Sequence, residues 1–412
     1  MKKTFLNILF LAASCLCAAC GGGGDEPVVQ PPVPTPSPET PVTPSTPDTP
    51  AEVLTAQLPS KSNTMKVYAH YMPWFVKPSA SGVWNHWTMS VNAVNSSNYA
   101  SWYHPLTNAY ASDDSDILDY QCLLMKYSGI DGVMVDWYGT QQKNDYPQNE
   151  VNTKALLKAV EKAKLKIAIV YEDATLNGLD DSGKQAQARS DMQYLNSDYF
   201  KSESYVKVDD RPLLLCFGPQ QLNTPKGWNF AFGTLSVKPE FIVLNGFSNR
   251  ANDASYITSQ GEFVWVNPNP DYQDAKNHDL YIAGAMPGFH DHYKESGQGN
   301  GYTTYDREDG QLFQRQLDAA RSAGLEWVQL STWNDYGEGT IIEPTTEFRY
   351  QYLEIVQQFA GVNYTSSQLD LIYRWYQVAK AKGSTNSSVQ KAYDYLNALQ
   401  PEKAEEIIKT LE

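Results

Sequence analysis

Cysteine is scarce in this chain of 412 residues: five are present, and only Cys122 and Cys216 lie beyond the first 20 residues. This scarcity excludes a small domain held together by disulfides. Basic residues are also few, with 32 Lys and Arg against 47 Asp and Glu and a formal net charge of −15. Because an acidic surface repels phosphate groups and anionic lipids, we expect no nucleic-acid partner.

Long hydrophobic runs are missing as well, and no segment after the amino terminus has enough uninterrupted apolar residues to span a bilayer. A short apolar run at residues 5–13 follows Lys2 and Lys3, which is typical of a secretory signal. Residues 16–20 then place small side chains before a cysteine, which resembles a bacterial lipoprotein signal. We expect residues 1–20 to be this signal and Cys20 to be the lipid anchor, in the bacterial cell envelope. Acylation of Cys15 and an ordinary cleaved signal are the alternatives.

Proline is unevenly distributed, because ten of the 24 prolines lie between Pro27 and Pro50. A segment of this composition cannot bury apolar area and favours an extended polyproline II spacer. We therefore predict a linker over residues 21–62, a large domain over 63–362 and a helical appendage over 363–412. This organisation leaves the lipid anchor as the only expected contact with a membrane, and nothing in the sequence indicates the oligomeric state.

Short apolar runs alternate with longer amphipathic stretches after the linker. We predict strands at residues 67–71, 132–137, 166–172, 212–217, 241–245, 263–266, 281–285 and 327–332. Helices are predicted at residues 117–127, 152–163, 184–195 and 309–323. Strands that are apolar along their length are typical of a parallel sheet covered on both faces. Without a Gly-rich phosphate loop after the first strand, the pattern favours a (β/α)8 TIM barrel, an α/β fold, over a doubly wound sheet.

Carboxylates and aromatic residues follow the predicted strands at their carboxyl ends, where barrel enzymes carry their active sites. Two carboxylates supply the acid and base that glycosidic cleavage requires, and aromatic faces stack on sugar rings. The residues that we expect at this rim are Tyr71, Trp74, Asp136, Trp137, Tyr138, Glu172, His290, Trp333, Asp335 and Glu338. We expect no metal and no cofactor, because the pair His290 and His292 has no third ligand at a defined spacing.

Asp335 and Glu338 are the strongest catalytic candidates among these residues. They are three positions apart in a turn after the last strand, so their Cβ atoms can lie about 5–6 Å apart. Like charges at that separation raise one pKa, which leaves one group as acid and the other as base. A capping box at a helix start is the alternative, and the neighbouring Trp333 and Tyr336 favour the catalytic interpretation.

Glu172 and Asp136 are candidates for binding the substrate in the barrel mouth. Glu172 follows an apolar run, and the alternative for it is a buried ion pair with a neighbouring strand. Asp136 has the same two interpretations, and Trp137 could take the inward position instead. A Ser-His-Asp hydrolase is set aside because no G-x-S-x-G elbow joins a strand to a helix.

Several motifs resemble those of family 99 glycoside hydrolases, which are endo-α-mannosidases and endo-α-mannanases on a (β/α)8 barrel. They lie at residues 70–74, 103–106, 110–114, 128–133, 136–139, 287–289 and 339–344, within a patchy similarity over residues 67–344. This resemblance implies that Glu338 is the acid/base and Asp335 the second carboxylate. It further implies that Glu172 holds the sugar next to the cleavage point, that Trp137 lines a subsite and that Tyr71 is an active-site tyrosine.

The catalytic turn departs from the family 99 pattern. Family 99 has Asn-Glu-Trp-His-Glu-Gly-Thr, whereas residues 334–340 of this chain read Asn-Asp-Tyr-Gly-Glu-Gly-Thr. Together with Trp333, this turn is similar to that of family 71, the endo-α-1,3-glucanases. Family 99 is thought to retain configuration through attack by the sugar's own 2-hydroxyl, which must be trans to the leaving group. In α-glucosides that hydroxyl is cis, so a glucanase would use a water on the opposite face.

We therefore expect an endo-acting glycoside hydrolase that cleaves internal α-linkages of a polysaccharide or glycan, with α-mannan as the favoured substrate. An inverting endo-α-1,3-glucanase is the first alternative. A non-catalytic glycan-binding lipoprotein is the second, and the presence of both carboxylates disfavours it.

Overall fold

The computed structural model describes residues 54–77, 84–89 and 99–412. In that part of the chain, eight parallel strands form a closed barrel: β1 (Lys66–Tyr71), β2 (Gly132–Trp137), β3 (Lys166–Tyr171), β5 (Arg211–Cys216), β6 (Glu240–Leu244), β7 (Gly261–Phe263), β8 (Leu280–Ala285) and β9 (Trp327–Leu330). The order around the barrel is β3-β2-β1-β9-β8-β7-β6-β5, and β5 pairs with β3 to close it. A two-residue strand, β4 (Lys207–Val208), pairs antiparallel with β5. The predicted (β/α)8 barrel is confirmed.

Alternation along the strands explains why they are apolar throughout. Met134, Val170, Leu215 and Ile282 belong to a cluster that fills the barrel interior, while their sequence neighbours pack outward under the helices. Both faces are therefore buried, as in other parallel barrels. The sequence predicts β7 at residues 263–266, but its pairing with β6 and β8 ends at Phe263.

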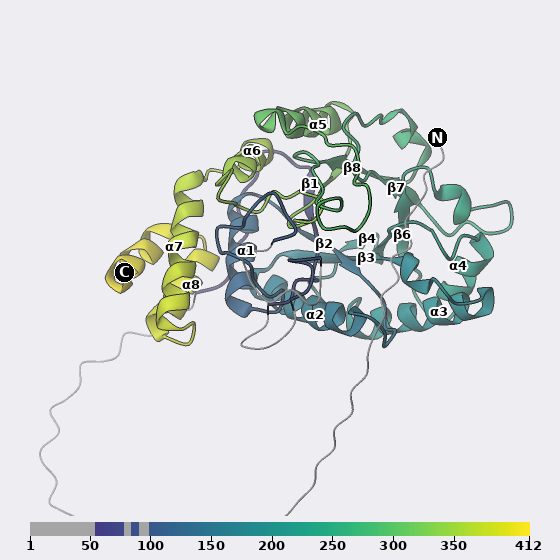
Figure 1. Cartoon of the computed structure of the whole chain (residues 1–412), viewed down its shortest axis with the longest axis horizontal. Helices are drawn as coiled ribbons and strands as arrows, with labels where there is room; N and C mark the ends of the chain where they lie inside the picture. The colour runs from purple at the N-terminus through teal and green to yellow at the C-terminus, as the bar shows by residue number, and fades with distance from the viewer. Residues whose placement is uncertain (1–53, 78–83, 90–98) are drawn as a thin grey trace, which may run out of the picture. The chain divides into compact units, whose positions relative to one another are not determined.

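Helices surround the barrel (Figure 1): α1 (Ser115–Tyr127), α2 (Tyr146–Ala163), α3 (Asp181–Asp198), α4 (Pro225–Phe232), α5 (Gln311–Ser322) and α6 (Gln351–Ala360). The Asp114 side chain caps α1 by accepting from the backbone N–H of Asp116 at 3.0 Å. The sequence analysis missed α4 and placed the start of α2 too late, because α2 begins at Tyr146 with a proline in its first turn. Only short 3-10 turns, Ser248–Arg250 and Gln273–Asn277, follow β6 and β7.

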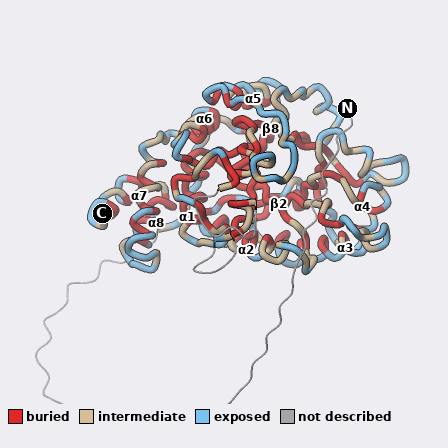
Figure 2. The backbone as a smooth tube through the Cα atoms, viewed as in Figure 1, coloured by how far each residue is buried: buried red, intermediate tan, exposed pale blue. Residues whose placement is uncertain are grey.

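Three further helices form the C-terminal appendage: α7 (Ser366–Lys382), α8 (Ser387–Asn397) and α9 (Pro401–Leu411). Figure 1 shows α7 beside α1, and Tyr376 of α7 packs on Tyr120 of α1 with ring centroids 5.1 Å apart. Thr365 and Gln368 form a capping box that starts α7. Figure 2 shows buried backbone where α1 meets this layer and exposed backbone on the outer faces of α7 and α8. The appendage is therefore packed against the barrel.

The compact unit begins at Leu54, before the predicted domain boundary at residue 63. Gln57 donates its backbone N–H to the carbonyl of Asn397 at 3.0 Å, and Ser62 donates to Gly361 at 3.1 Å. Cys20, the signal and most of the predicted linker lie outside the described residues. None of the helices within the described ranges is long and apolar enough to cross a membrane.

Candidate active site at the carboxyl ends of the strands

The turn after β9 holds the two catalytic candidates in place. Asp335 donates its backbone N–H to the Thr332 hydroxyl at 2.8 Å, and its Oδ1 accepts the backbone N–H of Glu338 at 3.0 Å. Asn334 fastens the turn to β1, because its side chain accepts from the Met72 N–H at 2.8 Å and donates to the Met72 carbonyl at 3.0 Å. No helix begins here, so Asp335 caps a turn and not a helix.

The two carboxyl groups of the turn have different proton affinities. Burial, and then the nearby charge of Asp335, raise the pKa of Glu338 to about 8. Burial also raises the pKa of Asp335, to about 6, while the backbone N–H of Glu338 and the charge of His86 hold it down. Near neutral pH, Glu338 is therefore protonated and Asp335 ionised, which is the division of roles that an acid and a base require.

Two further carboxyl groups lie on the same rim, one in the last two residues of β2 and one directly after β3. Asp136 points inward with Met134, two residues before it, and burial and the charge of Asp335 raise its pKa to about 8. Burial and the charge of Asp136 raise the pKa of Glu172 well above its usual range. Glu172 accepts from the Ala174 N–H at 3.2 Å and makes no ion pair within the described ranges. The ion-pair alternative for Glu172 is therefore not realised there.

Three of the expected rim residues do not reach the mouth and are corrected here. Tyr71, Trp137 and Trp333 have no exposed surface. The Tyr71 hydroxyl donates to Gln121 of α1 at 2.7 Å, and the Trp137 indole donates to Glu150 of α2 at 2.6 Å. For Tyr71 and Trp137 the reason is alternation along each strand: His70 and Asp136 take the inward positions, so Tyr71 and Trp137 face the helices. Trp333 lies in the turn after β9, and its ring is part of the hydrophobic core between the barrel and the helices.

Three other expected residues keep part of their surface exposed at the rim, namely Trp74, Tyr138 and His290. Trp74 stacks on His86 with ring centroids 4.6 Å apart and lies 6.3 Å from the ring of Tyr138. His86 contacts Asp145 at 2.8 Å. Trp74, His86 and Tyr138 form an aromatic cluster on the β1 and β2 side of the mouth, whereas His290 follows β8. Contact of these residues with substrate stays a prediction.

Tyr293 is a site residue that the sequence analysis missed. Its hydroxyl donates to Oε1 of Glu338 at 3.2 Å. It comes from the loop after β8, and the only signal for it in the sequence is its place one residue after His292. A hydroxyl that donates to the ionised form of Glu338 lowers the pKa of that carboxyl, against the effect of burial.

The buried carboxyl group of Glu343 stabilises the turn through hydrogen bonds. Glu343 accepts from the hydroxyls of Tyr110 and Tyr336, both at 2.8 Å, and from the Gln121 amide at 2.6 Å. Burial raises the pKa of Glu343 to about 7 in spite of these donors. Since the aromatic ring of Tyr336 is tied down in this way, the turn is braced on both sides of Glu338.

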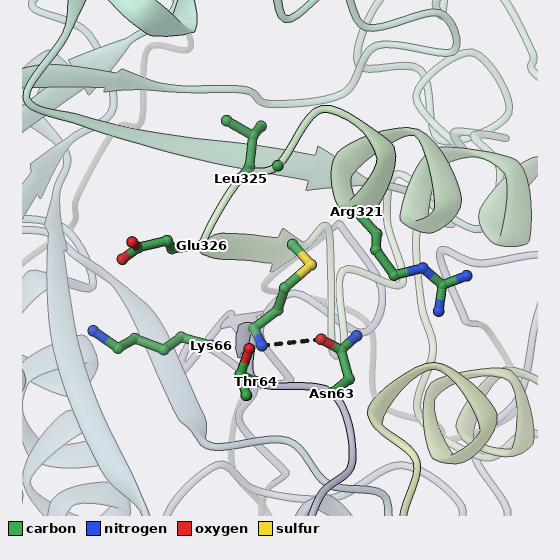
Figure 3. Close-up of a pocket in the computed structure, with 8 residues that line it drawn as sticks. Asn63, Thr64, Lys66, Arg321, Leu325 and Glu326 are labelled. Carbon is green, nitrogen blue, oxygen red and sulfur yellow. Dashed lines mark hydrogen bonds between the residues drawn. The ribbon is translucent and has the colours of Figure 1, made fainter.

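A surface pocket lies at the opposite end of the barrel (Figure 3). It has a volume of about 480 Å³ and is lined by residues 63–66, Arg321 and residues 324–326, at the amino ends of β1 and β9. The Asn63 side chain accepts the Met65 N–H there at 3.0 Å. The amino end of barrel strands is the end that serves stability, so we do not assign this pocket to the substrate.

No group of three or more His, Cys, Asp or Glu side chains in the described ranges is arranged to hold a metal ion. Cys122 and Cys216 are buried, and burial raises the pKa of each thiol far above its usual range. Neither thiol is thus activated as a nucleophile or a metal ligand.

A closed (β/α)8 barrel with paired carboxyl groups and aromatic side chains at the carboxyl rim has the architecture of a glycoside hydrolase. A family model described as a domain of unknown function (DUF5010) matches residues 229–382. The chain is 22% identical over 368 residues to a mouse protein named glycoprotein endo-alpha-1,2-mannosidase-like protein, covering 77% of this chain and 78% of that protein. A human protein of the same name is 22% identical over 333 residues, covering 69% and 70%.

Solved structures show the same fold. The GH99 endo-alpha-mannosidase from Bacteroides thetaiotaomicron superposes with a TM-score of 0.58 at 19% identity, over 74% of this chain and 99% of that chain. A glycoside hydrolase-like protein superposes with a TM-score of 0.52 at 14% identity, over 76% and 97%. The resemblance to family 99 predicted from the motifs is thereby confirmed. The family 71 character of the turn stays a prediction.

Proposed function

We propose that this protein is an endo-acting glycoside hydrolase that cleaves internal α-glycosidic linkages of an α-mannan-type polysaccharide or glycan. The observation that carries the proposal is the pair Asp335 and Glu338, whose surroundings separate their pKa values at the carboxyl rim of the barrel. The names of the mouse and human relatives and of the Bacteroides enzyme support α-mannosides as the substrate class.

In the proposed reaction, Glu338 donates its proton to the glycosidic oxygen as the bond from that oxygen to the anomeric carbon breaks. The nucleophile attacks the anomeric carbon and loses its proton to Asp335. For an α-mannoside the nucleophile is the trans 2-hydroxyl of the same sugar, and water later opens the resulting ring with retention. For an α-glucoside the nucleophile is a water on the opposite face, with inversion.

The direct test incubates the protein with α-mannan and with α-1,3-glucan and measures released oligosaccharides. We expect release from α-mannan and loss of turnover in Glu338→Gln with little loss of affinity, because a general acid acts chiefly in the transition state. Preference for α-1,3-glucan would favour the glucanase suggested by the turn at residues 333–338. Binding without cleavage of either polymer, unchanged in Glu338→Gln, would identify a glycan-binding protein instead.

Proton NMR of the first-formed product separates the two routes. The retaining route releases the α-anomer first, whereas an initial β-anomer is the product of a water attacking the opposite face. Asp335 is one methylene shorter than the glutamate of family 99, which leaves more room for such a water. An initial β-anomer from α-mannan would therefore reject the 2-hydroxyl mechanism but would not contradict the proposed hydrolase activity.

We further propose that lipid on Cys20 anchors the protein to the bacterial cell envelope. The charged start, the apolar run and the small residues before Cys20 support this location. Mass spectrometry of the mature amino terminus checks it, with Cys20→Ala and Cys15→Ala as a matched pair. Lipid that persists in Cys20→Ala but disappears in Cys15→Ala would move the anchor to Cys15.

A further inference from the structure

An exposed aromatic surface lies beside Glu338, and its two most exposed rings, Trp102 and Tyr302, have no role assigned above. We define the aromatic platform as Trp102, His290, Tyr293 and Tyr302. Trp102 is 40% exposed and Tyr302 59% exposed. The Trp102 ring stacks on His290 with centroids 4.6 Å apart and planes 9° from parallel. It also contacts the tilted ring of His292 with centroids 5.2 Å apart, so its exposed surface lies outside these two contacts.

The platform is tied directly to the candidate acid. His290 donates its backbone N–H to the carbonyl of Glu338 at 3.0 Å, and the Tyr293 hydroxyl donates to Oε1 of Glu338 at 3.2 Å. Tyr302 packs edge-on against Tyr293 with centroids 5.9 Å apart. Both exposed rings are thus linked to Glu338 through a single intervening aromatic residue.

Asp291 connects the residues of the platform through hydrogen bonds. Its buried side chain accepts the backbone N–H of Tyr293 at 3.0 Å and that of Tyr302 at 2.7 Å. Its backbone carbonyl accepts the Trp102 indole N–H at 3.0 Å. With its indole N–H satisfied inside the protein, the Trp102 side chain offers an apolar ring and no free donor to an incoming ligand.

The order of strands sets the platform apart from the other rim residues. Along the barrel the order is β3, β2, β1, β9, β8, so Glu172, Asp136 and Trp74 lie on one side of the turn after β9. His290, Tyr293 and Tyr302 belong to the loop after β8, on the other side. Trp102 comes from the segment between β1 and α1 and is joined to that loop by its indole hydrogen bond to the Asp291 carbonyl at 3.0 Å. Glu338 therefore stands between the platform and the remaining carboxyl groups.

We propose that Trp102 and Tyr302 bind the sugar rings on the leaving-group side of the scissile bond, while the side that carries Trp74, Asp136 and Glu172 holds the sugar that is attacked. This assignment rests on the proposed function, because the acid must stand next to the oxygen that joins the two sides. Exposed aromatic rings suit contact with the C–H faces of pyranose rings. An endo-acting enzyme needs such a surface, because its polymer continues beyond the cleavage point.

The test compares Trp102→Ala and Tyr302→Ala with wild type on two substrates. α-1,2-Mannotetraose has sugars on the leaving-group side, whereas α-mannobiosyl fluoride has only a fluoride there. We expect kcat/KM for the tetraose to fall about 10-fold or more and that for the fluoride to stay within about twofold. Phe230→Ala, which removes a similarly exposed aromatic ring (38%) on α4, is the matched control and should change neither.

Equal losses on the two substrates, or no loss on the tetraose, would overturn the assignment. If wild type cleaves neither substrate, the proposed hydrolase fails, and calorimetric titration with mannotetraose then tests the platform alone. Weaker binding of mannotetraose by Trp102→Ala than by Phe230→Ala would support the aromatic platform as a carbohydrate-binding surface. Equal affinities of the two variants would reject it. Unchanged melting temperatures show that the variants fold.

Discussion

At the scale of single residues, two carboxyl groups of one turn are held in different environments. Oδ1 of Asp335 accepts the backbone N–H of Glu338, which favours the ionised form, whereas Glu338 is buried beside that negative charge. The charge of His86, in the loop after β1, also lowers the pKa of Asp335. The difference in pKa thus arises from local donors and burial and not from the residue types alone.

A bell-shaped pH dependence of kcat/KM is expected from this pair. Below about pH 6 Asp335 takes up a proton and the base is lost, and above about pH 8 Glu338 loses its proton and the acid is lost. Initial rates on α-mannan between pH 4 and 10 check this expectation. A rate that keeps rising above pH 8 would argue against Glu338 as the acid.

Tyr293→Phe should move the alkaline limb of that profile to higher pH. The Tyr293 hydroxyl stabilises the ionised form of Glu338, so its removal raises the pKa of the acid further, by a fraction of a pH unit up to about one unit. Tyr305→Phe in the same loop is the control, since its ring packs on Phe289. An alkaline limb that stays at the same pH, or moves to lower pH, would contradict the hydrogen bond from Tyr293 to Glu338.

At the scale of elements, loops from different strands brace the catalytic turn. Arg307, which follows the β8 loop, is buried and donates to the carbonyls of Gly339 at 2.5 Å and Ile341 at 3.3 Å. Its guanidinium also lies 4.4 Å from the ring of Tyr103 and 4.5 Å from that of Phe348. One side chain thereby joins the β8 loop to the segment that follows Glu338.

Arg307→Met should destabilise the protein by about 1–3 kcal/mol, because two buried carbonyls lose their donor. It should also lower kcat more than it raises KM, since Glu338 would be held less firmly. Arg315→Met is the control, because Arg315 is exposed and pairs with Glu308, so its loss should change the stability little. Thermal unfolding and steady-state rates measure both effects, and equal stabilities of the two variants would refute the bracing role.

At the scale of the whole molecule, the C-terminal helices are joined to the barrel through a buried lysine. Lys126 of α1 is fully buried, and its ammonium donates to the backbone carbonyl of Asn397 at 2.9 Å and to the Asn397 side chain. Burial lowers the pKa of Lys126 to about 7. Asn397 also donates to the carbonyl of Lys162 at 2.9 Å, so α1, α2 and α8 meet at one residue.

Lys126→Met should remove the contribution of Lys126 to the pH dependence of the free energy of unfolding. Between about pH 7 and 10.5 the unfolded chain holds a proton on Lys126 that the folded chain lacks, so stability rises with pH in wild type. Relative to Lys126→Met, the gain should approach about 1.4 kcal/mol per pH unit within this window. Lys158→Met, at an exposed position of α2, should follow wild type. Denaturant unfolding at pH 7 and 9 makes the comparison, and parallel curves for all three proteins would contradict it.

Much of the architecture can be predicted from the sequence because periodicity and strand ends are local properties. Eight apolar runs with carboxylates and aromatic residues at their carboxyl ends predict the barrel and the rim that carries Asp335 and Glu338. Short elements are harder: α4 has eight residues and begins at a proline, and β7 pairs over three residues only. Their bounds depend on neighbours in space.

The sequence alone thus determined the fold class and the presence of two carboxyl groups in the turn after the last strand. Only the tertiary structure decided which residue of each neighbouring pair faces the mouth, as with Asp136 against Trp137 and His70 against Tyr71. It also brought together residues far apart in the chain, such as Trp102 and Asp291, separated by 189 positions, and Tyr293 and Glu338, separated by 45. The physical reason is that side-chain direction follows from strand register and barrel closure, which long-range pairing sets.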